Sequence, residues 1–375
     1  MSRGFSLYLD LVRFAAAVVV LFSHIAYERY SAGALAWVRD LNIGSDAVIL
    51  FFVLSGFVIA YTTFGKKRGA ADFTKARVAR LYSVVIPAVL LAIFLDTAGQ
   101  ALNPERYEGW WYQPLPVSEH FFRALSFSTQ LWSDNIRLGT NGPFWSLTYE
   151  AWYYLAFGVA VYSRGHARWL ILALLALITG PKIILLAPCW LAGVGLEYGI
   201  RKGHLRNLSR PGAIFMAVAP WLVYSFCLFC GLPETLRAIT ADMLGANPTR
   251  VLGFSDEVFW NSLIAVLASL HFLGVYNLAG NGDRISPKME KVIRWTAGAT
   301  FSVYLFHYPL LTFFYSFPVY EPANSLHVII LGLVTLISCF ILAEVSERRL
   351  SSWRSMMDRI AETGRKQHVR QRSVS

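Results

Sequence analysis

The sequence predicts an all-α, polytopic integral membrane protein with about ten transmembrane helices and both termini in the cytoplasm. Three observations support this prediction. Of the 375 residues, 55% are hydrophobic and only 15% are charged, whereas a soluble domain has about 25% charged residues. Apolar runs of close to 20 residues, the length that crosses a bilayer as a helix, recur along the chain. The basic residues fall mainly in every second connection between these runs.

Ten apolar runs are assigned as membrane spans. The fifth and sixth are the least distinct, because only the tetrapeptide TGPK separates them, and the fifth is short for a complete crossing. The ten predicted spans cover residues 7–27, 44–64, 79–97, 143–163, 167–180, 182–200, 212–231, 258–279, 294–317 and 325–345.

The distribution of Lys and Arg orients these spans. With the N-terminus in the cytoplasm, 25 of the 34 Lys and Arg residues fall in cytoplasmic segments and eight in outer connections, and Arg13 lies inside a span. Cytoplasmic segments of membrane proteins are enriched in Lys and Arg. The count therefore places both termini in the cytoplasm and favours an even number of spans.

The chain divides into a transmembrane region, residues 1–346, and a basic cytoplasmic tail, residues 347–375. The tail is predicted to begin as a surface helix on anionic lipid. The net charge of +11 does not indicate nucleic-acid binding, because the basic residues lie between apolar runs and in the tail rather than on one soluble face. The outer connection 97–142 is rich in aromatic residues, which either form an interfacial belt or stack on sugar rings.

The cysteines are predicted to be packing residues, and no metal site is expected. Cys227 and Cys230 form a Cys-x-x-Cys sequence, but it lies inside an apolar run. No other Cys or His is close enough in sequence to complete a zinc site.

Arg13 and His24 are ionisable residues within the first apolar run, LVRFAAAVVVLFSH. They are eleven positions apart, so on a helix their side chains project within about 20° of each other and about 16 Å apart along the axis. Ionisable groups inside a membrane usually face a cavity or a partner. The alternative interpretation is that Arg13 reaches the inner headgroups and His24 lies at the outer edge of the membrane. The shared helix face argues against this alternative.

Glu150 is the second candidate for chemistry. It lies in the stretch FWSLTYEAWYYL, at the start of the fourth span and at a depth similar to that of His24. A carboxylate beside an imidazole orients it and stabilises its charged form, as in a general-base pair. Glu150 could equally cap the helix or reach the outer headgroups. The sequence does not show that Glu150 and His24 touch.

Arg77 and Arg80 lie three residues apart at the cytoplasmic end of the third span, in KARVARLYSVVIP, and therefore share a helix face. Two interpretations remain open for them. They anchor the helix at the inner headgroups, or they bind a phosphate, because a guanidinium group matches phosphate oxygens in a bidentate fork. Arg13 would extend such a phosphate site into the membrane.

Three further residues are candidates. Ser55 precedes Gly56 in the middle of the second span, where a glycine permits close approach of another helix or a ligand. Asp46 lies at the outer end of the same span. It is interpreted either as a helix cap or as a neighbour of the active site. His307 lies within the ninth span and is either a packing residue with a hydrogen bond or a ligand-binding or catalytic residue.

Taken in order along the chain, these stretches resemble motifs of the acyltransferase-3 family of membrane O-acyltransferases. That family includes acetylases of bacterial lipopolysaccharide, exopolysaccharide and Nod factors. The resemblance rests on RFAAAVVVLFSH, FFVLSGF, the Arg-x-x-Arg followed by proline, FWSLTYEAWYYL and YLFHYPL. SERRL, which contains Glu347, is similar to a closing Glu-Arg-Pro motif, although Arg349 stands where proline is usual. Ile49 stands where the family often has an acid.

The resemblance implies the function and the site residues. It implies an enzyme of the bacterial inner membrane that moves an acyl group, expected to be acetyl, from cytoplasmic acyl-CoA to a hydroxyl of a glycan or lipid-linked sugar on the outer side. His24 would be catalytic, Glu150 would support the chemistry, and Arg13, Arg77 and Arg80 would contact CoA. Acetyl-CoA is then the donor substrate, the partners are the acceptor glycan and membrane lipid, and neither a metal nor nucleic acid is expected.

The sequence leaves three points open. A transporter or flippase of a glycan or lipid-linked sugar is the alternative function, because intramembrane charges also mark substrate paths. Many transporters contain inverted repeats, and none is evident here, which favours the enzyme. A covalent acyl-histidine mechanism would use His24 just as a general-base mechanism does. A homodimer is compatible with the sequence.

Overall fold

The computed structural model describes residues 1–65, 69–280, 285–353 and 355–356, and these residues are almost entirely helical. Ten predicted spans coincide with helices α1 (Arg3–Ile25), α4 (Ile43–Gly65), α5 (Ala70–Leu102), α7 (Phe144–Tyr162), α8 (Gly165–Thr179), α9 (Pro181–Lys202), α10 (Arg210–Phe229), α13 (Val258–Leu278), the pair α14 (Pro287–Ala297) and α15 (Thr300–Tyr315), and α16 (Ser325–Val345).

Short helices fill the connections between the spans. They are α2 (Glu28–Ser31), α3 (Ala36–Asp40), η1 (Pro104–Tyr107), α6 (Val117–Leu125), α11 (Leu232–Leu244), α12 (Pro248–Leu252), η2 (Gly253–Ser255) and η3 (Glu347–Arg349). Within the described ranges, β pairing consists of two isolated bridges, Gln113–Gly139 and Leu138–Asn141.

Seven helical segments of the described chain have the length and hydropathy that a membrane crossing requires. The all-α, polytopic fold class is thereby confirmed. α8 and α15 have only 15 and 16 residues, and α7 carries the polar residues Ser146, Thr148 and Glu150 among its apolar ones. The number of ten crossings therefore stays a prediction.

The ninth predicted span, residues 294–317, is wrong as one continuous helix. α14 ends at Ala297 and α15 begins at Thr300. Arg348 donates a hydrogen bond of 2.8 Å to the carbonyl of Trp295, which the end of α14 leaves without a helical partner, and its guanidinium lies 4.3 Å from the centre of the Trp295 ring. The break exposes the N-terminus of α15 to other parts of the chain.

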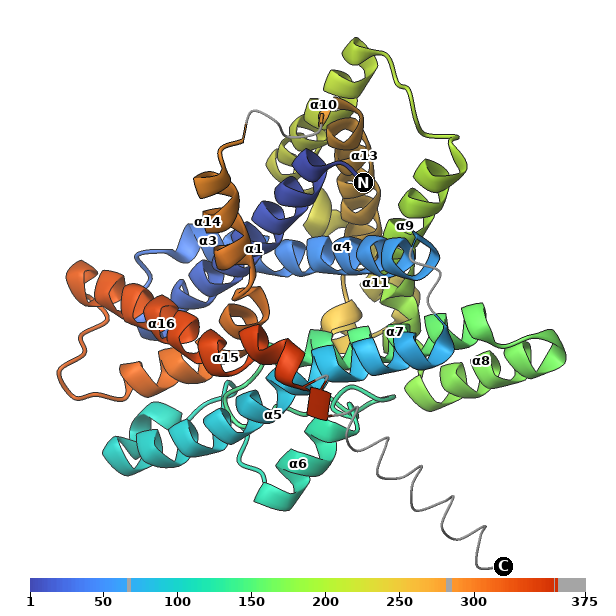
Figure 1. The fold of residues 1–375 in the computed structure, drawn as a ribbon. Helices are drawn as coiled ribbons and strands as arrows, with labels where there is room; N and C mark the ends of the chain where they lie inside the picture. The colour runs from blue at the N-terminus through green and yellow to red at the C-terminus, as the bar shows by residue number, and fades with distance from the viewer. Residues whose placement is uncertain (66–68, 281–284, 354, 357–375) are drawn as a thin grey trace, which may run out of the picture.

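Helix α4 lies at the centre of the fold (Figure 1) and packs against α1 on one side and against α9 and α13 on the other. α4 and α9 cross so closely that a Cβ at Gly56 would overlap the carbonyl of Trp190, and one at Gly193 would overlap the carbonyl of Val53. The prediction of close helix approach at Gly56 is confirmed. α15 packs against α1, α5 and α16.

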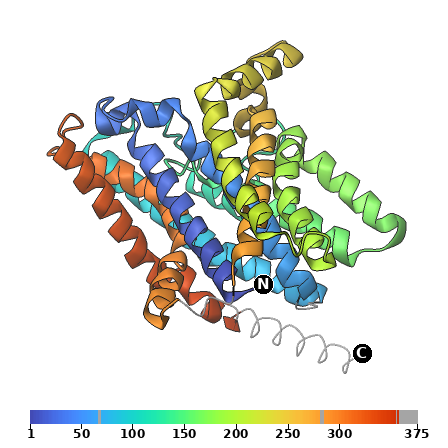
Figure 2. The same ribbon diagram turned by 90° about the horizontal axis from the view of Figure 1, so that it is seen from above.

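Both ends of the described chain lie beside α14. Arg3, at the start of α1, forms an ion pair with Glu290 of α14, and Arg348, beyond α16, reaches Trp295 of the same helix. Figure 2 shows the N-terminus and the end of α16 along one edge of the molecule. Two ends on one side agree with an even number of crossings. Their location in the cytoplasm stays a prediction, and the tail from residue 357 onward lies outside the described residues.

Candidate active site

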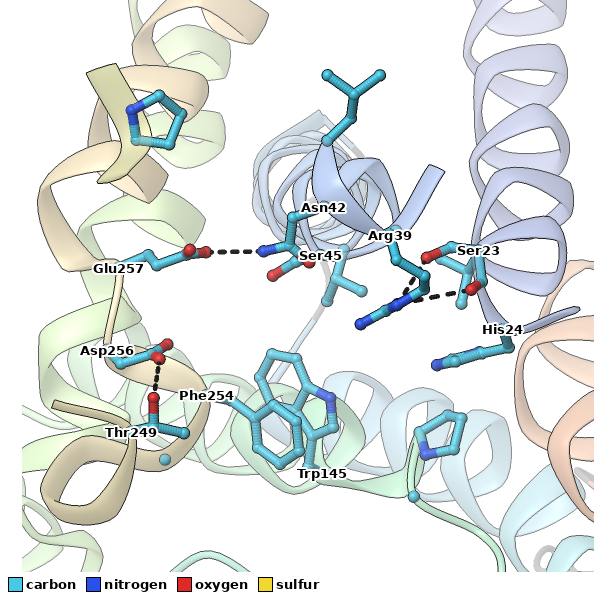
Figure 3. Close-up of a pocket in the computed structure, with 18 of the residues that line it drawn as sticks. Ser23, His24, Arg39, Asn42, Ser45, Trp145, Thr249, Phe254, Asp256 and Glu257 are labelled. Carbon is cyan, nitrogen blue, oxygen red and sulfur yellow. Dashed lines mark hydrogen bonds between the residues drawn. The ribbon is translucent and has the colours of Figure 1, made fainter. Parts of the chain in front are cut away.

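Two cavities lie along α1, one near His24 and one near Arg13. We call the first the outer cavity and the second the inner cavity, after the predicted orientation. The outer cavity has a volume of about 480 Å³. Figure 3 shows His24 and Arg39 projecting into it from one wall, Asp256 and Glu257 lying on the opposite wall, and Trp145 and Phe254 between them.

His24 forms a pair with His307 of α15. The His24 Nδ1 and His307 Nε2 atoms are 2.7 Å apart, and the two rings are nearly parallel. His307 Nδ1 lies 2.8 Å from the carbonyl oxygen of Val303, so Nδ1 must donate its hydrogen there. In a neutral His307, Nε2 is then an acceptor, and His24 must donate from Nδ1. This network leaves the lone pair of His24 on Nε2.

Aromatic rings hold His24 on two further sides. Tyr27 stacks on it with ring centres 5.8 Å apart, and Tyr308 meets it edge-on at 4.8 Å. Arg29 donates a hydrogen bond to the hydroxyl of Tyr308 and lies 4.4 Å from the ring centre of Tyr30. Burial alone would lower the pKa of Arg29, but Tyr30 and Tyr308 raise it above its ordinary value. Arg29 is thus a permanent cation that fixes Tyr308 beside His24.

The outer cavity is lined by polar and aromatic side chains. Arg39 donates to Ser23 Oγ at 3.0 Å. On the opposite wall, the Asp256 carboxylate accepts from Thr249 Oγ1 at 2.6 Å, and the Glu257 carboxylate accepts from Asn42 Nδ2 at 3.1 Å. The rings of Trp145 and Phe254 stack face to face with centres 4.3 Å apart and planes 4° apart. Such a surface provides both hydrogen-bonding groups and an aromatic platform for a hydroxyl-rich ligand.

Sequence reasoning assigned no individual role to Arg39, Phe254, Asp256 or Glu257, and it included Trp145 only as part of the motif FWSLTYEAWYYL. Asp256 and Glu257 carried a weak signal, because they immediately precede the predicted span 258–279. Arg39 and Phe254 carried none, since they come from short segments whose position depends on the fold.

The inner cavity collects three arginines from two helices. It has a volume of about 270 Å³ and is lined by Arg13 of α1 and by Arg77 and Arg80 of α5. A neighbouring space of about 230 Å³ shares Arg13 and Arg80 with it and extends to Gly298, at the break between α14 and α15. The three predicted phosphate contacts therefore line one cavity. Their role in binding CoA stays a prediction.

The predicted pairing of His24 with Glu150 is wrong. Glu150 lines the inner cavity. There it accepts a 2.5 Å hydrogen bond from Ser55 Oγ and another from the hydroxyl of Tyr154. The depth of both residues along their helices was a poor guide, because contact also depends on which face of α7 points toward α1. His307 occupies the position at His24 that Glu150 was expected to take.

Ser55 and Asp46 differ in their relation to the two cavities. Ser55 lines the inner cavity and also accepts a hydrogen bond of 3.1 Å from Trp190 Nε1. Asp46 is buried and accepts hydrogen bonds from Tyr224 of α10 and Trp260 of α13, at 2.6 and 3.0 Å. Asp46 therefore joins α4 to two neighbouring helices, which is a structural role.

The two cavities share two lining side chains, Val48 of α4 and Tyr304 of α15, and we call this common boundary the junction. The hydroxyl of Tyr304 forms a hydrogen bond of 2.7 Å with Ser146 Oγ, and its ring lies 6.3 Å from that of His307. The junction is thus next to the histidine pair. Among the described residues, no group of three or more His, Cys, Asp or Glu side chains is close enough to hold a metal ion.

A polytopic helical membrane protein with a histidine pair beside two neighbouring cavities is the class that the fold and the site define. The family model for the acyltransferase domain of the acyltransferase-3 family matches residues 6–344. The chain belongs to this family.

Two curated relatives carry related names. An O-acetyl transferase of Shigella phage Sf6 is 27% identical over 172 residues, which are 45% of this chain and 50% of the phage protein. Acyltransferase MdmB of Streptomyces mycarofaciens is 29% identical over 150 residues, which are 39% of this chain and 36% of that protein. The matches thus span half or less of these relatives. No solved structure matches the chain significantly.

Proposed function

We propose that the protein is an O-acyltransferase of the bacterial inner membrane that moves an acetyl group from cytoplasmic acetyl-CoA to a hydroxyl of a glycan or lipid-linked sugar on the outer side. The observation that carries this proposal is that the two cavities lie on either side of a common boundary, Val48 and Tyr304. One cavity offers three guanidinium groups, and the other offers the candidate base His24 with polar and aromatic walls. Family membership and the relatives' names support the reaction type.

On the donor side, the phosphates of CoA bind among Arg13, Arg77 and Arg80. Guanidinium groups form charge-assisted, bidentate hydrogen bonds with phosphate oxygens. Arg13 and His24 lie eleven residues apart on α1, or about 16 Å along its axis. An extended pantetheine arm covers a distance of this order, passes the junction at Val48 and Tyr304, and presents its thioester to His24.

On the acceptor side, the sugar ring stacks on the platform of Trp145 and Phe254 while its hydroxyls bond to the polar wall residues. One hydroxyl approaches His24 Nε2, whose lone pair the hydrogen-bond chain from Val303 through His307 leaves free. A neutral imidazole in this tautomer is a general base.

The reaction then proceeds by addition and elimination. The acceptor oxygen attacks the thioester carbonyl carbon as its proton moves to His24 Nε2, and the carbonyl becomes an oxyanion. The imidazolium donates more strongly from Nδ1 to His307, which stabilises the developing positive charge. The C–S bond breaks, the sulfur takes the proton from His24 Nε2, and the products are the O-acyl ester and CoA with a free thiol. His24 returns to its starting state.

Mass spectrometry of surface glycans tests the proposal. Cells that express the chain are compared with cells that lack it and with cells that express a membrane-inserted His24→Ala variant. The expected result is a mass increase of one acetyl group per modified sugar in the first population only. Identical glycan masses in all three populations, with the wild-type protein present in the membrane, would refute the proposed function.

A further inference from the structure

Glu347, the first residue of the predicted cytoplasmic tail, has no role in the function described so far. Its side chain is buried, with 4% of the residue exposed, although it begins a segment rich in charged residues. A buried carboxylate is costly unless charged or polar partners surround it. The partners of Glu347 therefore indicate what it does.

The Glu347 carboxylate joins two elements of the inner region. One oxygen, Oε2, accepts a hydrogen bond of 3.1 Å from the backbone N–H of Ser302. Ser302 is the third residue of α15, and N–H groups in the first turn of a helix have no acceptor within the helix. The other oxygen, Oε1, lies 3.0 Å from Arg80. The break between α14 and α15 makes this arrangement possible, because it opens the N-terminus of α15.

Arg80 is thereby held in one orientation. One of its terminal nitrogens pairs with Glu347, and its guanidinium lies 4.3 Å from the centre of the Phe301 ring. A guanidinium group has five N–H donors in a fixed fork, so a single carboxylate leaves other donors for a ligand. Arg80 lines both inner spaces, together with Arg13.

We propose that Glu347 is a positioning residue that orients Arg80 for a phosphate group of the acyl-CoA donor. This inference rests on the proposed function. Glu347 does not touch the donor, and it acts only through the guanidinium of Arg80. Its bond to the first turn of α15 fixes it relative to the helix that also carries Tyr304 and His307.

The test compares two donors that share the thioester and the pantetheine arm and differ in phosphates. Acetyl-CoA has them and S-acetylpantetheine lacks them. Wild-type and Glu347→Gln proteins in lipid nanodiscs are assayed for acetyl transfer to the glycan fraction that the wild type modifies. The amide keeps the shape of the side chain and one acceptor oxygen for Ser302. Glu344→Gln is the matched control, because Glu344 is an exposed acid that pairs with Arg348.

We expect Glu347→Gln to raise the KM for acetyl-CoA by about tenfold, the effect of one charge-assisted hydrogen bond, and to leave kcat/KM for S-acetylpantetheine within about twofold. In an Arg80→Ala background, the same substitution should have no further effect, as expected when one residue acts through another. The Glu344→Gln control should match the wild type with both donors.

Three results would overturn the inference. An equal loss with both donors would show a purely structural role. An unchanged or lowered KM for acetyl-CoA would show that Glu347 does not assist the donor or that it competes with it. If Glu347→Gln fails to accumulate in the membrane, Glu347→Asp is tested instead. Asp retains the charge on a shorter side chain. The same comparison of the two donors then decides whether the inference holds.

The experiment also separates this inference from the proposed function. A wild-type protein that transfers from neither donor contradicts the proposed function itself. A wild-type protein that uses both donors equally well contradicts the phosphate role of Arg80, and with it that of Glu347. A wild type that prefers acetyl-CoA, combined with a normal Glu347→Gln protein, contradicts the role of Glu347 alone.

Discussion

Replacing His307 tests the proposed role of the histidine pair. His307→Leu fills a similar space but cannot accept the hydrogen bond that His24 Nδ1 donates across 2.7 Å. His24 then loses both the partner that fixes its tautomer and the acceptor that stabilises its charged form. Leu also has no donor for the Val303 carbonyl. His307→Gln is therefore the matched variant, because its amide can both accept and donate hydrogen bonds.

The expected magnitude follows from the change in this hydrogen bond during the reaction. In the resting protein it joins two neutral groups and is worth about 0.5–1.5 kcal/mol; when His24 is protonated, it becomes charge-assisted and is worth about 1.5–3 kcal/mol. The typical difference is about 1 kcal/mol, and its loss lowers kcat by about fivefold. Loss of the correct tautomer adds to this value, so we expect a fall in kcat of roughly 5- to 100-fold.

The assay measures release of the CoA thiol and transfer of the acyl group by purified protein in nanodiscs. The KM values for donor and acceptor should change little in His307→Leu, because His307 is buried behind His24. His307→Gln should recover most of kcat, and His24→Ala/His307→Leu should be no slower than His24→Ala. A well-folded His307→Leu protein with the wild-type kcat would refute the assignment of the tautomer and of the base.

Four other predictions concern the donor, the acceptor, stability and topology. Arg77→Ala/Arg80→Ala should raise the KM for acyl-CoA more than tenfold and leave the KM for the acceptor unchanged; normal acyl-CoA binding would contradict this. Trp145→Ala should raise the KM for the acceptor and leave the KM for the donor unchanged. An altered donor KM would count against stacking of the acceptor on Trp145 and Phe254. Asp46→Ala should destabilise the fold by about 1–3 kcal/mol and lower Tm in detergent, and an unchanged Tm would argue against its helix-joining role. A cysteine at Tyr112 should react with an impermeant reagent from outside and one at Ser373 should not; the reverse pattern would defeat the predicted topology.

Local patterns determined the helices and much of the donor region. Apolar runs of bilayer length predicted every long helix, because each run forms and buries its own backbone hydrogen bonds within one segment. The spacing of Arg77 and Arg80 placed both on one face of α5, since three residues are close to one helical turn. Arg13 joins them in the structure, as its position on the cytoplasmic half of α1 suggested.

The sequence was a weaker guide wherever several helices meet. It predicted one helix across residues 294–317, because the break depends on a distant contact. Arg348 donates a hydrogen bond to the carbonyl of Trp295, 53 positions earlier in the chain. It also paired His24 with Glu150 on depth alone. Depth follows from the position of a residue in its own span, but the direction of its side chain relative to another helix depends on how the helices pack.

What the sequence by itself determined is therefore the set of ionisable residues inside the membrane and their order along each helix. Both follow from helix geometry, which fixes the angle and rise per residue. The tertiary structure alone decided that His24 meets His307, that Glu150 belongs with Ser55 in the inner cavity, and that Tyr304 lines both cavities. These are contacts between residues that are 95 to 283 positions apart, and only the packing of α1, α4, α7 and α15 around one another brings them together.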